Sequence, residues 1–316
     1  MNALDATQLA LIDALAGGDQ VSGAQLAERL SLSREAISKR IARLAEFGLE
    51  IRSSAGHGYQ LSQPLERLDA AALQAALSGH CAVSVLPTTA STNAWLRDQA
   101  GGTHLCLAEH QSAGRGRRGR RWHSPFGRNL YLSLRQELTH WPARLGALPL
   151  VIGVALAEYF DSLGVPLQLK WPNDLYLEGR KLGGLLIEQG GEAHGPCRLV
   201  VGLGINHSMA PDTRLDQPWI SLTAAGHALS RNALAAGLAH CLLDTLAELD
   251  DAQIGARLER FARFDLFRDQ AVHLHQEDGV REGVARGIDA AGRLQLETPH
   301  GVVAVSVGDV SLRAVP

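Results

Sequence analysis

The segment AGRGRRGRRW, residues 113–122, constrains the fold more than any other stretch, because it places five arginines within the eight positions from Gly114 to Arg121. Its glycines also match the dinucleotide-binding spacing G-x-G-x-x-G. That motif needs a strand before the glycines and a helix directly after them. The strand-like run THLCLAEHQ precedes the segment, but a breaker-rich stretch and then the alternating run NLYLSLR follow it. The match is therefore accidental, and the sequence predicts a loop between two strands.

This arginine loop (residues 113–122) has the composition of an anion-binding segment. Its guanidinium groups repel one another and its glycines leave the backbone free, so we expect a mobile loop that an anion orders. Arginine suits that role, since its planar fork binds phosphate bidentately and keeps its charge. An RNA-binding patch is the competing interpretation. It is disfavoured because the loop lacks interleaved aromatic residues and lies inside a compact α/β segment.

The composition bounds the class of protein. A chain of 316 residues with 46% hydrophobic side chains can form two or three domains with real cores. The net charge is −3, so any contact with nucleic acid must come from a local basic patch. The four cysteines lie far apart without a C-x-x-C pair. This argues against a zinc site or a disulfide framework and fits a reducing cytoplasm.

No stretch of the sequence resembles a signal peptide or a membrane span. The N-terminus lacks a cationic region followed by an apolar stretch. The longest apolar run, Leu145–Phe160, contains Pro149 and Glu158, so we expect a buried helix. These features predict a cytoplasmic protein with no membrane partner.

Residues 1–62 are expected to form three short helices and a hairpin. SGAQLAERL opens with Ser22 and has a glutamine three residues later, the spacing of a capping box. After the turn SLS, Ser33 can cap the helix REAISKRIARLAEFG, whose apolar residues form one stripe. LEIRSSAGHGYQLS then alternates around a glycine-rich turn. This order predicts a winged helix-turn-helix, whose second helix enters the major groove of DNA.

The charge of this module is concentrated on one part. Residues 1–62 carry six Lys and Arg against seven Asp and Glu, but from Arg29 to Arg52 the count is six against three. A helical docking domain with a solvated basic face is the competing interpretation. The residues expected to contact DNA are Ser22, Ser33, Arg34, Ser38, Lys39, Arg40 and Arg43.

Three further stretches accompany the arginine loop. TTASTNAWL carries the polar cluster STN at 91–93, which can start a helix. LKWPNDLYLEGRKLGGLLIE places Lys170 and Lys181 on either side of Pro-Asn-Asp, and VVGLGINHS is a β-like run that includes Asn206. Each alone has a bland explanation: a cap, a turn, a surface lysine or a buried strand.

Together, STN, AGRGRRGRRW, KWPNDLY, RKLGGLLIE and GLGIN, in this order, resemble the biotin protein ligase family. The N-terminal module resembles that of the bifunctional branch, in which the ligase is also the biotin operon repressor. The resemblance spans essentially the whole chain. It implies that biotin and ATP form biotinyl-5′-adenylate, from which biotin passes to a lysine of biotin carboxyl carrier protein. Such chemistry needs positioning and charge neutralisation, with Mg²⁺, more than a nucleophilic side chain.

The resemblance also implies roles for individual residues. Lys181, with Arg115 and Arg117, would supply the catalytic charge, and Asp174 would orient Lys181 or the metal. No fixed protein metal site is implied. The biotin site would consist of Ser91, Thr92, Asn93, Gln111, Gly114, Arg115, Gly116, Arg117 and Lys181. The nucleotide site would consist of Arg117, Trp122, Lys170, Asp174, Lys181 and Asn206.

Two departures from the family pattern are small. The second lysine motif reads KLGG, whose extra glycine is expected only to loosen the backbone, and His123 after Trp122 is interpreted as incidental. The arginine loop would close as a lid over the adenylate and exclude water from a reactive mixed anhydride.

The predicted fold class is α+β with several domains. Residues 1–64 form the winged helix-turn-helix, and 65–268 form an α/β ligase domain with a mixed sheet, of which 65–80 is a linker. From about Gln270, short alternating runs predict a small antiparallel barrel, which the resemblance makes an SH3-like domain at 269–316. The resemblance further implies homodimerisation on adenylate binding and a two-half-site operator.

Two alternatives stay open. One is a lipoate-type ligase on a similar fold, although the arginine loop and KWPND favour biotin. The other is a DNA-binding regulator that senses biotinyl adenylate without ligase turnover. The presence of Lys181 and Arg117 disfavours it.

Overall fold

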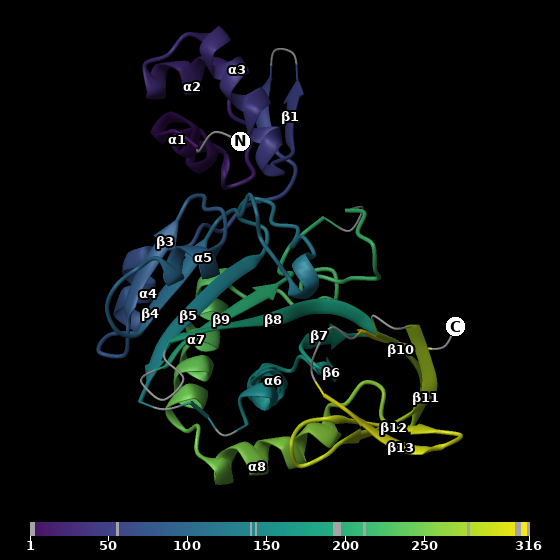
Figure 1. Cartoon of the computed structure of the whole chain (residues 1–316). Coiled ribbons are helices and arrows are strands. Elements are labelled where there is room, and N and C mark those ends of the chain that lie inside the picture. The colour runs from purple at the N-terminus through teal and green to yellow at the C-terminus, as the bar shows by residue number, and fades with distance from the viewer. Residues whose placement is uncertain are drawn as a thin grey trace.

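The computed structural model describes residues 4–54, 57–139, 141–142, 144–191, 197–210, 213–276, 279–306 and 311–314. Three folded parts follow one another along the chain: an N-terminal helical module, a central domain around a large sheet, and a C-terminal β domain (Figure 1). This α+β organisation is the predicted one.

The N-terminal module has the predicted order of elements: α1 (Ala6–Leu15), α2 (Gly23–Leu30), α3 (Arg34–Leu44) and the hairpin β1 (Ile51–Ser54) with β2 (Gly58–Leu61). Ser22 and Gln25 form the expected capping box at α2, and Ser33 Oγ accepts from Ala36 N at 3.2 Å. The helix α3 ends at Leu44, earlier than expected, because a 3-10 turn (Ala45–Phe47) leads into Gly48 with φ 76°.

The core of this module is the predicted apolar stripe packed against the other helices. Ile37, Ile41 and Leu44 of α3 are buried with residues of α1 and α2. One member of this core, Phe126, comes from the central domain, and its backbone N donates to Phe47 O at 2.8 Å. The module therefore docks on the central domain through a shared apolar contact.

The central domain is built on a seven-stranded sheet in the order β3-β4-β5-β9-β8-β7-β6. Only β3 and β4 pair in parallel, so the predicted mixed sheet is confirmed. The strands are β3 (Ala82–Leu86), β4 (His104–Ala108), β5 (Leu130–Leu138), β6 (Gln168–Lys170), β7 (Asp174–Leu177), β8 (Arg180–Gly191) and β9 (Cys197–Ile205). The arginine loop connects β4 to β5, as predicted.

The two faces of this sheet differ in chemistry because side chains alternate along each strand. On one face Leu132, Leu134, Val201 and Leu203 join a large core with the helices α6 (Leu148–Ser162), α7 (Arg231–Ala247) and α8 (Asp251–Arg260). On the other face the small or polar residues Ser133, Gly202 and Gly204 alternate with them, and α5 (Thr92–Arg97) covers only part of it. This polar face has room for a site.

The apolar run at Leu145–Ser162 is long and apolar enough to cross a membrane, and it is the one such helix among the described residues. In the structure it contributes α6, and ten residues of this helix are buried in the core of the central domain. The helix is therefore a core element, as expected from the sequence.

Residues 65–80, expected as a linker, are a folded part of the central domain. They contain α4 (Ala70–Ala76), capped by Asp69, and bury Leu73 and Leu77 against the core. Arg128 holds the stretch before it, donating to Pro64 O at 2.9 Å and to Gln63 O at 3.0 Å. The linker prediction was wrong because this alanine-rich segment, with two core leucines, shows little hydrophobic periodicity in its sequence.

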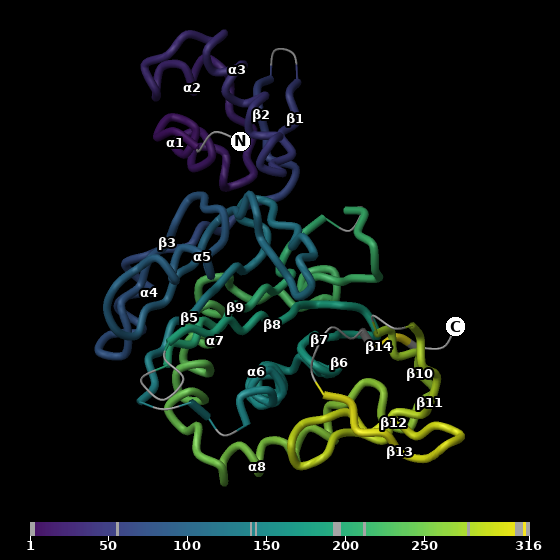
Figure 2. Tube along the Cα trace, in the orientation of Figure 1, coloured from purple at the N-terminus to yellow at the C-terminus, as the bar shows by residue number. Residues whose placement is uncertain are grey.

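The C-terminal domain is a five-stranded antiparallel sheet in the order β13-β12-β11-β10-β14. Its strands are β10 (Gln270–Gln276), β11 (Gly279–Ile288), β12 (Leu294–Thr298), β13 (Gly301–Val305) and β14 (Ser311–Ala314). In the view of Figure 2, β14, which pairs with β10, lies between β10 and β7 of the central sheet. Trp171 Nε1 donates to Gly292 O at 3.1 Å, and Leu274 and Leu312 join the central core.

Candidate functional site

The polar face of the central sheet holds the residues expected to bind biotin. Ser91 caps α5, and the first two residues of that helix, Thr92 and Asn93, are buried. Gln111 lies just after β4, where Thr92 N donates to Gln111 Oε1 at 2.9 Å. The structure thus brings STN and Gln111 into one cluster.

Ser133, which the sequence reasoning missed, completes this cluster from β5. Its hydroxyl oxygen lies 2.7 Å from Thr92 Oγ1 and 2.6 Å from Asn93 Oδ1. The side chain is fully buried. The signal in the sequence was a serine among leucines in the run NLYLSLR. Serine is uncommon in a buried strand, so its presence indicates a polar contact.

Two glycines of β9 make room on the same face. A Cβ at Gly202 would lie 2.3 Å from Asn93 Oδ1, and one at Gly204 would lie 2.6 Å from Trp122 Cε2. The alternation G-x-G in VVGLGIN therefore seats the Asn93 amide and the Trp122 ring side by side on one strand. The sequence showed these glycines, but not what lies above them.

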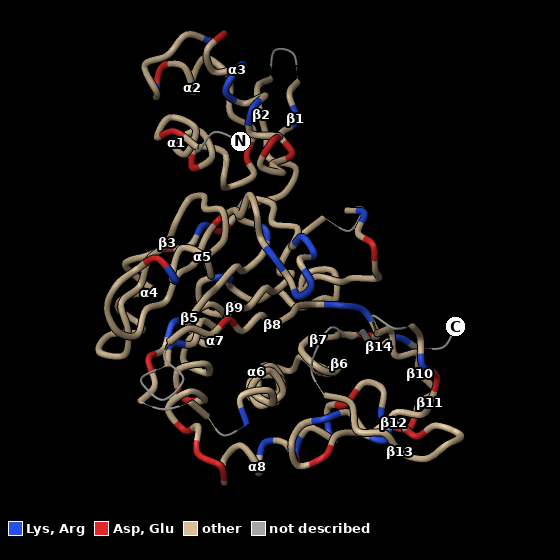
Figure 3. Tube along the Cα trace, viewed as in Figure 1, with Lys and Arg blue, Asp and Glu red and all other residues tan. Residues whose placement is uncertain are grey.

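The arginine loop has a compact hairpin conformation in the structure. The backbones of Arg115 and Arg121 form an antiparallel β-bridge. Gly116 N donates to Arg120 O at 2.8 Å, and Trp122 N donates to Gly114 O at 2.9 Å. Figure 3 shows the loop's basic residues above the basic start of β8. The expected mobility of the loop stays a prediction.

Contacts with the KWPND turn and β8 close the other side of this site. Arg117 Nη1 donates to Asn173 Oδ1 at 3.2 Å, and Lys181 Nζ lies 2.7 Å from Asp174 Oδ1. Lys181 Nζ also lies 5.7 Å from the centre of the Trp122 ring. The Trp122 Nε1 atom is buried and has no hydrogen-bond partner within the described chain. The Lys181–Asp174 pair therefore lies beside the loop, next to the loop's own Trp122 ring.

Lys170 is partly buried rather than a fully solvated surface lysine. Its Nζ donates to Tyr176 Oη at 3.1 Å and lies 5.2 Å from the centre of that ring. Desolvation lowers the pKa of Lys170 to about 8; nearby Asp174 raises it, while Lys181, Arg313 and Arg120 lower it. The site therefore concentrates cations, which favours an anionic ligand.

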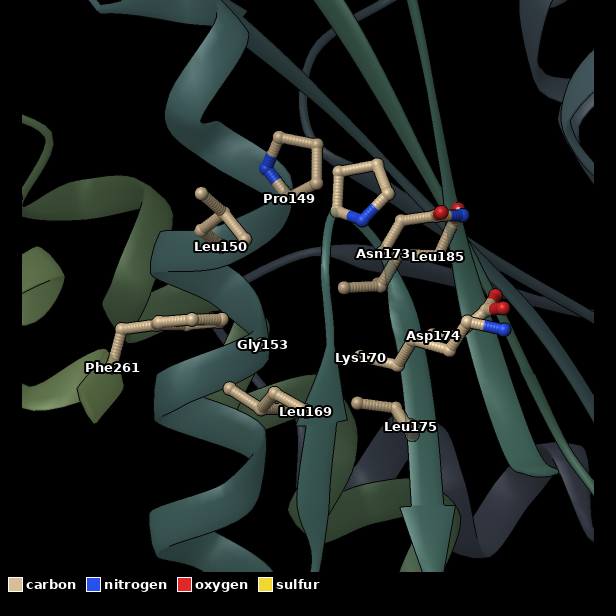
Figure 4. Close-up of a pocket in the computed structure, with 11 residues that line it drawn as sticks. Pro149, Leu150, Gly153, Leu169, Lys170, Asn173, Asp174, Leu175, Leu185 and Phe261 are labelled. Carbon is tan, nitrogen blue, oxygen red and sulfur yellow. The ribbon is translucent and has the colours of Figure 1, made fainter. Parts of the chain in front are cut away.

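An apolar layer supports this turn from behind. Pro149, Leu150, Leu169 and Phe261 are among the residues that line a small pocket beside α6 and this turn (Figure 4). In the same view the polar atoms of Asp174 point away from α6, toward the opposite side of the sheet. The turn therefore separates the apolar core from the charged site.

Gly183 and Asn206 hold β8 and β9 close together near Lys181. A Cβ at Gly183 would lie 2.5 Å from Gly204 O, so the extra glycine in KLGG permits a close strand approach rather than only loosening the backbone. Asn206 is buried; its backbone N donates to Leu182 O at 2.8 Å, and its Nδ2 to Ile220 O at 3.3 Å. The Asn206 side chain thus holds the start of β8 at Lys181 against the segment at Ile220.

The residues expected to contact DNA lie in the N-terminal module, away from this site. Arg34, Ser38, Lys39 and Arg43 are exposed on α3, and Arg40 is partly buried. Lys39 forms an exposed ion pair with Glu35 at 2.6 Å. The hydroxyls of Ser22 and Ser33 serve as helix caps.

Comparison with known proteins identifies relatives of each part. The Biotin/lipoate A/B protein ligase family matches residues 83–206, an HTH domain matches 7–60, and the biotin protein ligase C-terminal domain matches 269–313. A bifunctional ligase/repressor BirA from Salmonella typhimurium is 42% identical, with 97% of each chain covered. A BirA from Bacillus subtilis is 28% identical, covering 94% of this chain and 95% of the relative.

A solved structure is similar as well. The biotin protein ligase from Aquifex aeolicus in complex with biotin and ATP aligns with a TM-score of 0.63 and 26% identity. It covers 74% of this chain and 99% of that one.

Proposed function

Because the chain belongs to the bifunctional ligase/repressor BirA family, we propose that its polar-face site activates biotin with ATP and that its N-terminal module represses transcription. The products of activation are biotinyl-5′-adenylate and pyrophosphate. Biotin then passes to a lysine of biotin carboxyl carrier protein, and AMP leaves. The observation that carries the proposal is the Lys181–Asp174 pair beside Trp122, next to the Thr92–Gln111 cluster.

In this proposal the polar cluster receives biotin. Ser91, Thr92 and Gln111 line the place for its ureido ring, since they offer donors and acceptors within an otherwise buried face. Gly114 and Gly116 let the loop backbone approach the ligand. Asn93 belongs to the same cluster and contacts Ser133.

In this proposal the nucleotide lies beside the biotin. Trp122 offers its ring to the adenine, and Lys181, held by Asp174, meets the biotin carboxylate and the α-phosphate oxygens. Arg115, Arg117 and Lys170 add positive charge where negative charge develops during transfer. Asn206 contributes by bracing the segment after Lys181.

The arginine loop acts as a lid in this proposal. Its contact with Asn173 ties the loop to the KWPND turn and would exclude water from the mixed anhydride. Arg117→Gly is expected to let the adenylate escape and modify nearby proteins indiscriminately. If that variant retained its adenylate as tightly as the parent, the role of the arginine loop as a lid would be refuted.

Magnesium would accompany the nucleotide. Mg²⁺ commonly binds through substrate phosphates, water and one or two carboxylates. Asp174 is the carboxylate at the site, and it is paired with Lys181. Within the described residues, no group of three His, Cys, Asp or Glu could hold a metal. We therefore assign the ion to the phosphates.

The exposed basic residues of α3 would read operator DNA in the major groove. Adenylate-dependent homodimerisation would present two modules to a two-half-site operator. A protein that acts on a carrier protein and on operator DNA would work in the cytoplasm.

The test is ATP–[³²P]pyrophosphate exchange with Mg²⁺ and either biotin or lipoate. Biotin-dependent exchange supports adenylate formation. Exchange with lipoate alone would move the protein to the neighbouring ligase class. If neither acid supports exchange although biotin binds, the protein is a sensor without turnover.

A further inference from the structure

Glu188 of β8 contacts two residues of α5, one with each carboxylate oxygen. Oε2 accepts from Asn93 Nδ2 at 2.8 Å, and Oε1 accepts from Arg97 Nη1 at 3.1 Å. Asn93 and Arg97 are four residues apart and lie on one face of the helix. The Glu188 side chain is 31% exposed, whereas Asn93 is 5% exposed. The carboxylate thus reaches inward from the surface to the polar cluster.

This contact fixes which end of the Asn93 amide faces the cluster. An ionised carboxylate can only accept hydrogen bonds, so the atom that faces it must be the donating nitrogen. Leu186 O is a second acceptor on that side, 3.3 Å from Asn93 Nδ2. The Asn93 oxygen is therefore turned toward Ser133 Oγ, 2.6 Å away.

The direction of the next hydrogen bonds follows from counting hydroxyl protons. Ser133 has one proton and two close oxygens, Asn93 Oδ1 at 2.6 Å and Thr92 Oγ1 at 2.7 Å. Since Asn93 presents an oxygen, Ser133 must donate to it, and Thr92 must then donate to Ser133. Gln111 Oε1, 3.2 Å from Thr92 Oγ1, is served by the Thr92 N–H at 2.9 Å. This leaves Thr92 Oγ1 with lone pairs for an incoming N–H.

We propose that Glu188 is a positioning residue for biotin, which sets the polarity of the Thr92–Ser133–Asn93 chain so that Thr92 Oγ1 accepts from a ureido N–H. The inference rests on the proposed function. With the Asn93 amide reversed, Ser133 would accept from Asn93 and donate to Thr92. Thr92 Oγ1 would then already accept from Ser133, and its own proton would no longer be used on Ser133, so Thr92 would be a poorer acceptor for a ureido N–H.

The first test is Glu188→Gln, measured by biotin-dependent pyrophosphate exchange. A glutamine amide can present either end to Asn93, so only the contact with Leu186 O still favours the original polarity. The KM for biotin should rise about threefold, because only part of the population keeps Thr92 as an acceptor, with the KM for ATP and kcat within about twofold of the parent. Arg97→Ala removes only the outer contact of Glu188 and should change the KM for biotin by less than about twofold. Glu137→Gln, on β5, is the matched surface control, since its ion pair with Arg198 is long, at 3.8 Å.

The second test restores the polarity with swapped groups. Asn93→Asp alone places two carboxylates against each other and should weaken biotin binding strongly. In N93D/E188Q the glutamine donates to the new aspartate, whose other oxygen still accepts from Ser133. This double variant should bind biotin about tenfold more tightly than N93D.

Three results would overturn the inference: an unchanged KM for biotin in E188Q, an equal rise in E188Q and R97A, or no gain from N93D to N93D/E188Q. An equal rise would mean that Glu188 only anchors α5. A parent protein without biotin-dependent exchange would instead refute the proposed function.

Discussion

At the scale of single residues, the two glycines of β9 should be separable by assay. Alanine at Gly204 would displace the Trp122 ring, and alanine at Gly202 would displace the Asn93 amide, because each Cβ would lie within 2.6 Å of its neighbour. Overpacking of this kind costs about 1–3 kcal/mol. We expect Gly204→Ala to raise the KM for ATP roughly tenfold and Gly202→Ala to raise the KM for biotin to a similar extent. Steady-state exchange kinetics measure both.

Each glycine variant serves as the control of the other. If both variants raised both KM values equally, β9 as a whole would be distorted. The assignment of Gly202 to the biotin site and Gly204 to the nucleotide site would then be wrong.

Lys170 should make nucleotide binding depend on pH. Its ammonium, with a pKa of about 8, is charged below that pH and loses its charge above it. The KM for ATP should therefore rise as the pH passes from 7 to 9, with a midpoint near 8. Lys170→Arg keeps the charge and should remove that midpoint. The same shift makes stability rise between pH 8 and 10.5, because the unfolded state then binds more protons. A parent KM for ATP that is flat over this range would contradict the nucleotide role of Lys170.

At the scale of elements, Glu66 caps the start of α7. Its carboxylate accepts from Ser230 Oγ at 2.9 Å and from the backbone N of Arg231 at 2.6 Å and of Asn232 at 3.1 Å. Desolvation raises the pKa of Glu66, but these bonds and one from the Asn232 side chain outweigh it and lower the pKa to about 2.

This cap predicts an acid-sensitive contribution to stability. The folded pKa lies below the unfolded value of 4.5, so the stabilisation is present above pH 4.5 and is lost as the pH falls toward 2. Glu66→Gln should flatten the fall of Tm between pH 4.5 and 3, measured by circular dichroism. An unchanged slope in this variant would show that other carboxylates carry the acid dependence.

The elements also show which parts of the fold the sequence could reveal. Local signals, such as the caps at Ser22 and Ser33 and the alternation of β4 and β5, predicted elements correctly because they depend on neighbours in the chain. Ser133 and Glu188 were missed because their significance comes from α5, which meets them only through the order of strands in the sheet. The KWPND and arginine-loop residues were found by family resemblance, since spacing alone does not bring Arg117 to Asn173.

At the scale of the whole molecule, Arg128 ties the N-terminal module to the central domain. Its side chain is 6% exposed and donates to two backbone carbonyls, Gln63 O and Pro64 O. Arg128→Met would leave both carbonyls without these bonds and should loosen the segment between the domains. We expect trypsin to cleave faster after Arg67, and mass spectrometry can measure that cleavage rate. The rate of biotin-dependent exchange should stay within about threefold of the parent. Cleavage at the parental rate would show that the other contacts suffice.

The docked module also has a hydrodynamic consequence. Phe126 lies in the core of the N-terminal module, and Phe47 contacts His110 of the central domain with ring centres 5.2 Å apart. A module fastened in this way has no rotational diffusion of its own. Its backbone amides should therefore show the fast transverse relaxation and broad lines of a 33.8 kDa particle, rather than the sharp lines of a sixty-residue domain that tumbles independently.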